Sequence, residues 1–237
     1  MANKTNFTII IFTILAMTYS CSEASGSGAF KLVLSGSVHG QLDPCGWKKN
    51  PLGGLSRKYV KIQEMIKQGS DPLIVDAGDL FFSTKKLESW NKKSEEFRAK
   101  SILNGYARIG YDIINIGQYE VINGLTFLKS VTKDSDINFI SANLRDSKTG
   151  ALIFKPYHIF QRGGLNIGVI GVTDMLPDTS KSIIADDYIE VCRKYAKELS
   201  SNVDLVIALI NAERANQTKL AEKFDDVDFI ITSGSTN

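Results

Sequence analysis

The sequence predicts an α/β domain whose strands are mostly parallel and buried on both faces. Short apolar runs alternate with amphipathic helical segments along most of the chain, which is the order of strands and helices in α/β domains. The runs are almost free of polar residues, as expected for strands covered on both sides. Polar or glycine-containing loops follow several of them, where such folds place their sites.

Four strands and three helices are expected in the first part of the domain. Leu55, Tyr59, Ile62 and Ile66 have helical spacing, and Gly69-Ser70 ends that helix. Residues 83–98 are polar and indicate a solvated loop and the start of a helix. The expected strands are Phe30–Ser35, Leu73–Val75, Asp112–Ile116 and Asn138–Ala142; the expected helices are Leu55–Gln68, one continuing through Ala99–Ile109, and Leu125–Lys133.

The second part predicts a strand pair and then two further helix–strand units. Arg162-Gly163-Gly164 separates two apolar runs, which is typical of a hairpin turn. The expected strands are Ile153–Phe160, Leu165–Val172, Asp204–Ile210 and Asp228–Ile231; the expected helices are Asp187–Ser200 and Asn216–Phe224.

The N-terminus has the pattern of an export signal. Lys4 precedes an apolar run from Phe7 to Met17, and short residues lead to Cys21. Cys21 stands where a bacterial lipoprotein signal places its acylated cysteine, although ordinary cleavage after Ser20 remains an alternative. We therefore expect a signal peptide over 1–20, a Gly/Ser-rich tether over 21–29 and a single domain over 30–237. The protein is expected to be exported to the periplasm or cell surface and held on the membrane by lipid.

Bulk composition excludes some functions and leaves others open. The net charge of +2 is too small to indicate a nucleic-acid polymer as partner. Cys45 and Cys192 fit no metal motif, and after export they either pair or remain independent thiols.

Five loops after expected strands carry an ordered series of motifs. They are Ser37-Val38-His39-Gly40, Gly78-Asp79, Gly117-Gln118-Tyr119-Glu120, Ile210-Asn211 and Gly234-Ser235-Thr236-Asn237. The series resembles the calcineurin-like metallophosphoesterases, and among them the 5′-nucleotidase branch. Gly53-Gly54-Leu55-Ser56-Arg57 and Gly110-Tyr111-Asp112 resemble flanking stretches of that branch. The resemblance covers residues 31–237.

The resemblance implies a layered αββα sandwich of two sheets flanked by helices, here short of its final strands. It also implies two divalent metals that clamp a phosphoryl group and activate a hydroxide. Compared residue by residue, only His39 and Asp79, the bridging aspartate, keep the family's metal ligands. The other ligand positions hold neutral groups, and Tyr119 stands at the catalytic histidine; the replaced ligand positions are Ser37, Gln118, Asn211, Ser235 and Asn237.

This pattern predicts a degenerate site without a resident cofactor. His39 and Asp79 alone would hold Zn, Mn, Mg or Ca weakly, and otherwise would form an ion pair or hydrogen bond. Hydroxyl and amide groups both donate and accept hydrogen bonds, so they can close the pocket without metal.

Three functions follow from this interpretation. The first is a non-catalytic binding or scaffolding lipoprotein with a protein partner. The second is a residual phosphoester hydrolase, for which His39, Asp79 and Glu120 remain in place. The third is a module that binds phosphate or nucleotide through backbone N–H groups of the glycine loops.

Overall fold

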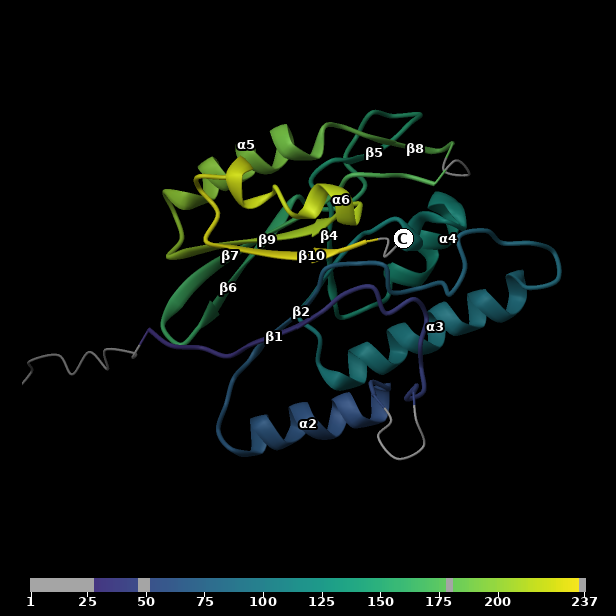
Figure 1. Cartoon of the computed structure of the whole chain (residues 1–237), viewed down its shortest axis with the longest axis horizontal. Coiled ribbons are helices and arrows are strands. Elements are labelled where there is room, and N and C mark those ends of the chain that lie inside the picture. The colour runs from purple at the N-terminus through teal and green to yellow at the C-terminus, as the bar shows by residue number, and fades with distance from the viewer. Residues whose placement is uncertain (1–27, 47–51, 178–180, 235–237) are drawn as a thin grey trace, which may run out of the picture.

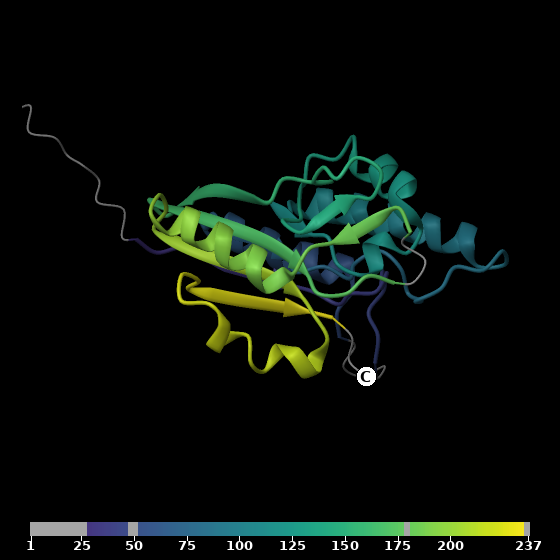
Figure 2. The ribbon, with the colours of Figure 1, turned by 90° about the horizontal axis from the view of Figure 1, so that it is seen from above.

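Two facing sheets with helices on their outer faces form the core of the structure. The computed structural model describes residues 28–46, 52–177 and 181–234. Within them the chain forms two four-stranded sheets and one two-stranded sheet. Helices α2 and α3 lie on one outer side and α5 on the other (Figure 1). Seen from above, α5 lies in front of the strands of the second sheet (Figure 2). The predicted α/β class and layered arrangement are confirmed.

The first sheet has the order β1-β2-β3-β4, and all its strands are parallel. Its strands are β1 (Leu32–Ser35), β2 (Leu73–Asp76), β3 (Ile113–Asn115) and β4 (Asn138–Ile140); its helices are α2 (Leu55–Lys67), α3 (Lys92–Ile109) and α4 (Gly124–Thr132). Parallel order brings the carboxyl ends of β1, β2 and β3 to one edge, where the first three motif loops begin.

The second sheet has the order β10-β9-β7-β6, with only β6 antiparallel to its neighbour. Its strands are β6 (Tyr157–Arg162), β7 (Leu165–Thr173), β9 (Leu205–Asn211) and β10 (Phe229–Ser233), and α5 (Tyr188–Ser200) packs on it. The short α6 (Arg214–Gln217) follows β9. The third sheet pairs β5 (Leu144–Asp146) with β8 (Ile183–Ala185).

Alternation of side chains along the strands produces three apolar layers. Leu73 and Val75 on β2 face β7 and β9, whereas Ile74 faces the helices of the first sheet. A third cluster between the second sheet and α5 includes Ala208 of β9. Because successive strand residues point to opposite faces, a strand buried on both sides must be apolar throughout.

Local signals explain where several elements begin and end. The Asp187 carboxylate caps α5 by accepting a 2.8 Å hydrogen bond from the Glu190 N–H, and substituting such a cap costs about 1 kcal/mol. Gly110 ends α3 in the left-handed region with φ 94°. Gly163 and Gly164, both with positive φ, turn β6 into β7.

Two predicted elements differ from the structure, and two observed strands were not predicted. The helix expected over 216–224 is wrong, because α6 covers only Arg214–Gln217 and a 3₁₀ turn follows at Ala221–Lys223. The strand expected from Ile153 instead begins at Tyr157, after Pro156. Strands β5 and β8 were not expected, because each has only three residues.

A buried polar network connects α2 to the end of β2. The Asp76 carboxylate is fully buried and accepts hydrogen bonds from Ser35 Oγ (2.5 Å), the Tyr106 hydroxyl (2.9 Å) and the Gly78 N–H (2.9 Å). Lys58 Nζ on α2 donates to the hydroxyls of Tyr106 (3.1 Å) and Tyr111 (2.8 Å). Burial lowers the pKa of Lys58 and raises that of Asp76. The network therefore ties a helix to the loop that carries Asp79.

The cysteines of the domain do not pair: Cys45 is exposed and Cys192 is buried, and both are free thiols. None of the helices in the described ranges is both long and apolar enough to cross a bilayer. The predicted signal and Cys21 lie outside the described residues.

Candidate functional site

The loops after β1, β2 and β3 meet at the carboxyl edge of the first sheet. Backbone hydrogen bonds continue past the strands, from the Ser37 N–H to the Gly78 carbonyl (2.9 Å) and from the His39 N–H to the Asp79 carbonyl (2.9 Å). Ser37, His39 and Asp79 are the non-glycine residues with positive φ in the described part of the chain, at 52°, 49° and 62°. Such conformations cost free energy and gather at functional sites, so these three residues mark this edge as the candidate site.

Glu120 fills the centre of this frame with a fully satisfied carboxylate. Its side chain is fully buried, and each oxygen accepts two backbone N–H groups. Oε2 accepts from Asp79 (2.9 Å) and Gly117 (2.8 Å), and Oε1 from Leu80 (2.6 Å) and Phe81 (3.1 Å). Burial, and then the Asp79 carboxylate, raise the pKa of Glu120 to about 8.

Asp79 is equally buried but only partly satisfied. Its Oδ1 accepts from the Tyr119 N–H at 3.0 Å, and its Oδ2 has no hydrogen-bond partner. Burial raises the pKa of Asp79. An unpaired buried oxygen costs free energy. The protein's own contacts therefore do not compensate the burial of Oδ2.

His39 is half-buried and packs on Tyr119, with ring centroids 4.4 Å apart. Its Nδ1 is buried and has no hydrogen-bond partner. Burial lowers the pKa of His39, and the Asp79 carboxylate opposes that effect. The ion pair or hydrogen bond expected between His39 and Asp79 does not form; Tyr119 instead contacts both, through its ring and its N–H respectively.

The replaced ligand positions that the structure describes act as links between loops. The Ser37 hydroxyl accepts from the Gly234 N–H (3.0 Å) and donates to the Gly234 carbonyl (3.2 Å), which joins the β1 loop to β10. Asn211 Oδ1 accepts from the Gln118 N–H (2.9 Å), and its Nδ2 donates to Ser233 Oγ (2.7 Å). A polar network thus closes this side of the site.

Ser233 was not singled out by the sequence, although its Oγ donates to the Ala77 carbonyl at 2.7 Å and so connects both sheets. Its position just before the last motif is the only sequence signal.

A small cavity of about 50 Å³ remains beside the network, lined by Lys85, Gln118, Met175, Asn211, Ala212, Glu213 and Gly234. Ser235 and Asn237 lie outside the described residues.

Comparisons with known proteins agree with this arrangement. The 5′-nucleotidase precursor of Thermus thermophilus has a similar structure over 86% of this chain and 41% of its own, with a TM-score of 0.71 and 23% identity. The calcineurin-like phosphoesterase YfkN of Bacillus subtilis matches 86% of this chain and 71% of its own, with a TM-score of 0.65 and 21% identity.

The chain has the calcineurin-like phosphoesterase fold. In sequence it is similar to 5′-nucleotidases, including the snake venom 5′-nucleotidase of Gloydius brevicauda, which is 25% identical over 96% of this chain. The chain spans 40% of the length of that relative. No family model matches the sequence.

The described residues do not fit the two-metal centre that the phosphoesterase fold implies. No group of three or more His, Cys, Asp or Glu side chains in the described ranges is placed to hold a metal ion. His39 Nδ1 and Asp79 Oδ2 are the buried ligand atoms without a hydrogen-bond partner at this edge, whereas Asn211 already uses both its amide atoms in hydrogen bonds. Catalytic zinc sites usually have three protein ligands, and this site offers fewer.

Proposed function

We propose that this chain is a non-catalytic protein with the calcineurin-like phosphoesterase fold. On this view it is an exported lipoprotein that binds or scaffolds a protein partner at the membrane. The observation that carries the proposal is the use of the former ligand positions as internal links. Ser37 and Asn211 connect loops, and Glu120 occupies the backbone N–H groups of the centre.

Metal analysis and enzyme assays test the proposal directly. The purified chain should contain no stoichiometric metal and should show no turnover of phosphomonoesters or diesters with Mn²⁺, Zn²⁺ or Mg²⁺. Asp79→Ala is the matched variant, because it removes the family's bridging ligand. Bound metal together with turnover that Asp79→Ala abolishes would refute the proposal.

A residual phosphoester hydrolase is the second candidate, and a specific observation favours it. Two buried ligand atoms, His39 Nδ1 and Asp79 Oδ2, lack hydrogen-bond partners. One weakly held cation would give both atoms a partner. Such an enzyme would act on a nucleotide or another small phosphate ester. His39→Ala should abolish its activity, whereas Glu213→Ala, a change beside the small cavity, should leave most of it.

A phosphate-binding module is disfavoured by the backbone contacts. The N–H groups of Gly78, Asp79, Leu80, Phe81, Gly117, Gln118 and Tyr119 all donate to acceptors inside the protein. Calorimetry with phosphate and with nucleotides should therefore show no binding heat at this edge.

The lipid anchor is tested separately from the site. Labelling cells with a radioactive fatty acid should mark the wild-type protein and leave the Cys21→Ser variant unmarked. Label on both proteins, or on neither, would contradict acylation at Cys21.

A further inference from the structure

The two helices α2 and α3 concentrate positive charge that the rest of the chain lacks. They carry nine cationic side chains and three carboxylates, a net charge of +6, in a chain whose total is +2. All other segments together are therefore net negative. The cations are Arg57, Lys58, Lys61, Lys67, Lys92, Lys93, Arg98, Lys100 and Arg108.

Ion pairs on the helices use only part of this charge. Glu64 pairs with Lys61 at 3.2 Å, Glu95 with Arg98 at 3.3 Å and Glu96 with Lys92 at 3.9 Å. Lys58 donates into the buried network below α2. Five exposed cations then remain without an ion pair in the described part of the chain: Arg57, Lys67, Lys93, Lys100 and Arg108.

Exposed apolar side chains stand among these cations. Phe97 on α3 is 72% exposed, and it lies four residues after Lys93 and three before Lys100, on one stripe of the helix. On α2, Val60 is 54% exposed and Tyr59 44% exposed. Aromatic and aliphatic side chains interleaved with Lys and Arg are typical of helices that lie in a membrane interface.

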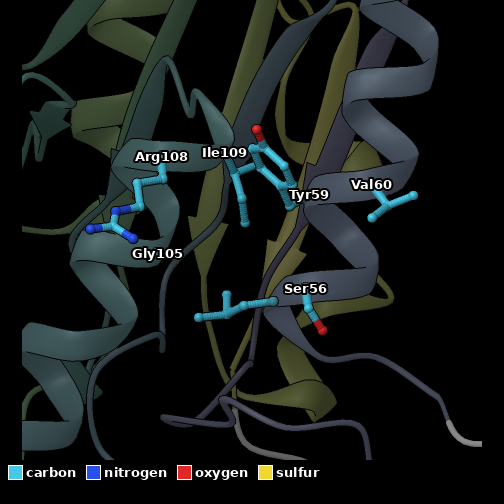
Figure 3. A pocket seen from close by; sticks show the side chains of 7 residues that line it. Ser56, Tyr59, Val60, Gly105, Arg108 and Ile109 are labelled. Carbon is cyan, nitrogen blue, oxygen red and sulfur yellow. The ribbon is translucent and has the colours of Figure 1, made fainter.

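A shallow cavity of about 540 Å³ lies between the two helices. Tyr59 and Ile109 meet between the helices, with Val60 and Arg108 to either side (Figure 3). Gly105 keeps the helices close, since a Cβ there would lie 2.5 Å from Leu55 Cδ1. The face is thus an apolar groove bordered by positive charge. Its lining shares no residue with the candidate site.

We propose that the α2–α3 face, defined by the exposed residues of these two helices, docks on an anionic phospholipid surface. Unpaired cations attract anionic headgroups, and their long apolar stems lie along the interface. Phe97, Tyr59 and Val60 enter the headgroup region between them. This docking does not depend on an acyl chain at Cys21 or on catalysis at the carboxyl edge.

Vesicle binding by a non-acylated chain tests the proposal. The protein is residues 21–237 with Cys21→Ser, which retains every element that the structure describes. It should co-sediment with phosphatidylcholine vesicles that contain phosphatidylglycerol and much less with pure phosphatidylcholine. Added salt should weaken the binding, because the Debye length shortens to about 3 Å at 1 M.

Charge reversal on each side of the molecule gives the matched comparison. Lys93→Glu with Lys100→Glu should reduce binding to the anionic vesicles by at least about 25-fold, at about 5-fold for each cation removed, and the added carboxylates weaken it further. Lys194→Glu with Lys197→Glu makes the same charge change on α5, whose two lysines are also exposed, and should leave most of the binding. Phe97→Ser should weaken binding without changing net charge.

Several results would overturn the proposal. Equal loss of binding in the two double variants would show that net charge rather than this face drives binding. Equal binding to neutral and anionic vesicles would show that attraction between the cations and anionic headgroups does not drive binding. Absence of vesicle binding, with capture of an acidic protein that Lys93→Glu/Lys100→Glu abolishes, would assign the face to a protein partner instead. Circular dichroism and melting curves confirm that each variant is folded.

Discussion

Glu120 and Asp79 are both fully buried carboxylates of the same site, yet their surroundings differ sharply. Glu120 accepts four backbone N–H groups, whereas Asp79 accepts one N–H on Oδ1 and leaves Oδ2 without a partner. A carboxylate whose acceptors are all used holds the fold together. A buried carboxylate with an unused oxygen lowers stability unless something else meets it. Glu120 therefore has a structural role, whereas Asp79 is the carboxylate that still has an oxygen free to bind a ligand.

Removing Glu120 should have the largest effect on stability. Glu120→Ala leaves four backbone donors buried without acceptors, each costing about 1–3 kcal/mol. We expect a loss of at least about 4 kcal/mol in the free energy of unfolding, measured by urea denaturation. Glu222→Ala, at an exposed position, should change it by less than about 0.5 kcal/mol. Similar free energies of unfolding for both variants would show that the four hydrogen bonds to Glu120 do not stabilise the fold.

Putting ligands back should lower stability and create a metal site. Ser37→Asp with Asn211→His restores the family's residues beside His39 and Asp79. Without metal it loses both hydrogen bonds of Asn211 and should cost about 2 kcal/mol. Zinc should recover that loss, because binding to the folded state alone stabilises it. A melting temperature that does not respond to zinc or to a chelator would contradict this expectation.

Changing Asp79 to its amide should have the smallest effect, with the opposite sign. Asp79→Asn keeps an acceptor for the Tyr119 N–H and removes the unpaired buried charge, and asparagine tolerates the φ of 62° well. We expect a gain of about 1 kcal/mol by urea denaturation.

The matched control is Asp76→Asn, because Asp76 is equally buried but has partners on both oxygens. That variant should be less stable than the wild type. If both changes destabilise, Asp79 has a stabilising partner in solution, and a bound cation becomes the first candidate.

The sequence predicts the strands best where burial leaves a clear pattern. Strands Leu205–Asn211 and Leu73–Asp76 are apolar up to their last residue, and both were expected close to their observed bounds. The wrong helix over 216–224 has only Leu220 and Phe224 as buried side chains. Two inward side chains do not stabilise two helical turns, so the segment forms shorter structure.

The site was predictable as a set of loops but not as a set of contacts. The order of motifs placed His39, Asp79 and Glu120 at one edge. Glu120, however, accepts from Leu80 and Phe81, about forty residues earlier in the chain, and such pairing depends on how the loops close in three dimensions. Ser233 was missed for the same reason, because its partner Ala77 follows β2 and its partner Asn211 ends β9.

The network around Asp76 also has a structural consequence. Lys58 on α2 donates to the hydroxyls of Tyr106 and Tyr111. The Tyr106 hydroxyl donates to the Asp76 carboxylate, which also accepts from the Gly78 N–H next to Asp79. These short contacts form one unbroken series from α2 to the loop that carries Asp79. The outer helix and the edge of the pocket are therefore parts of a single hydrogen-bonded unit.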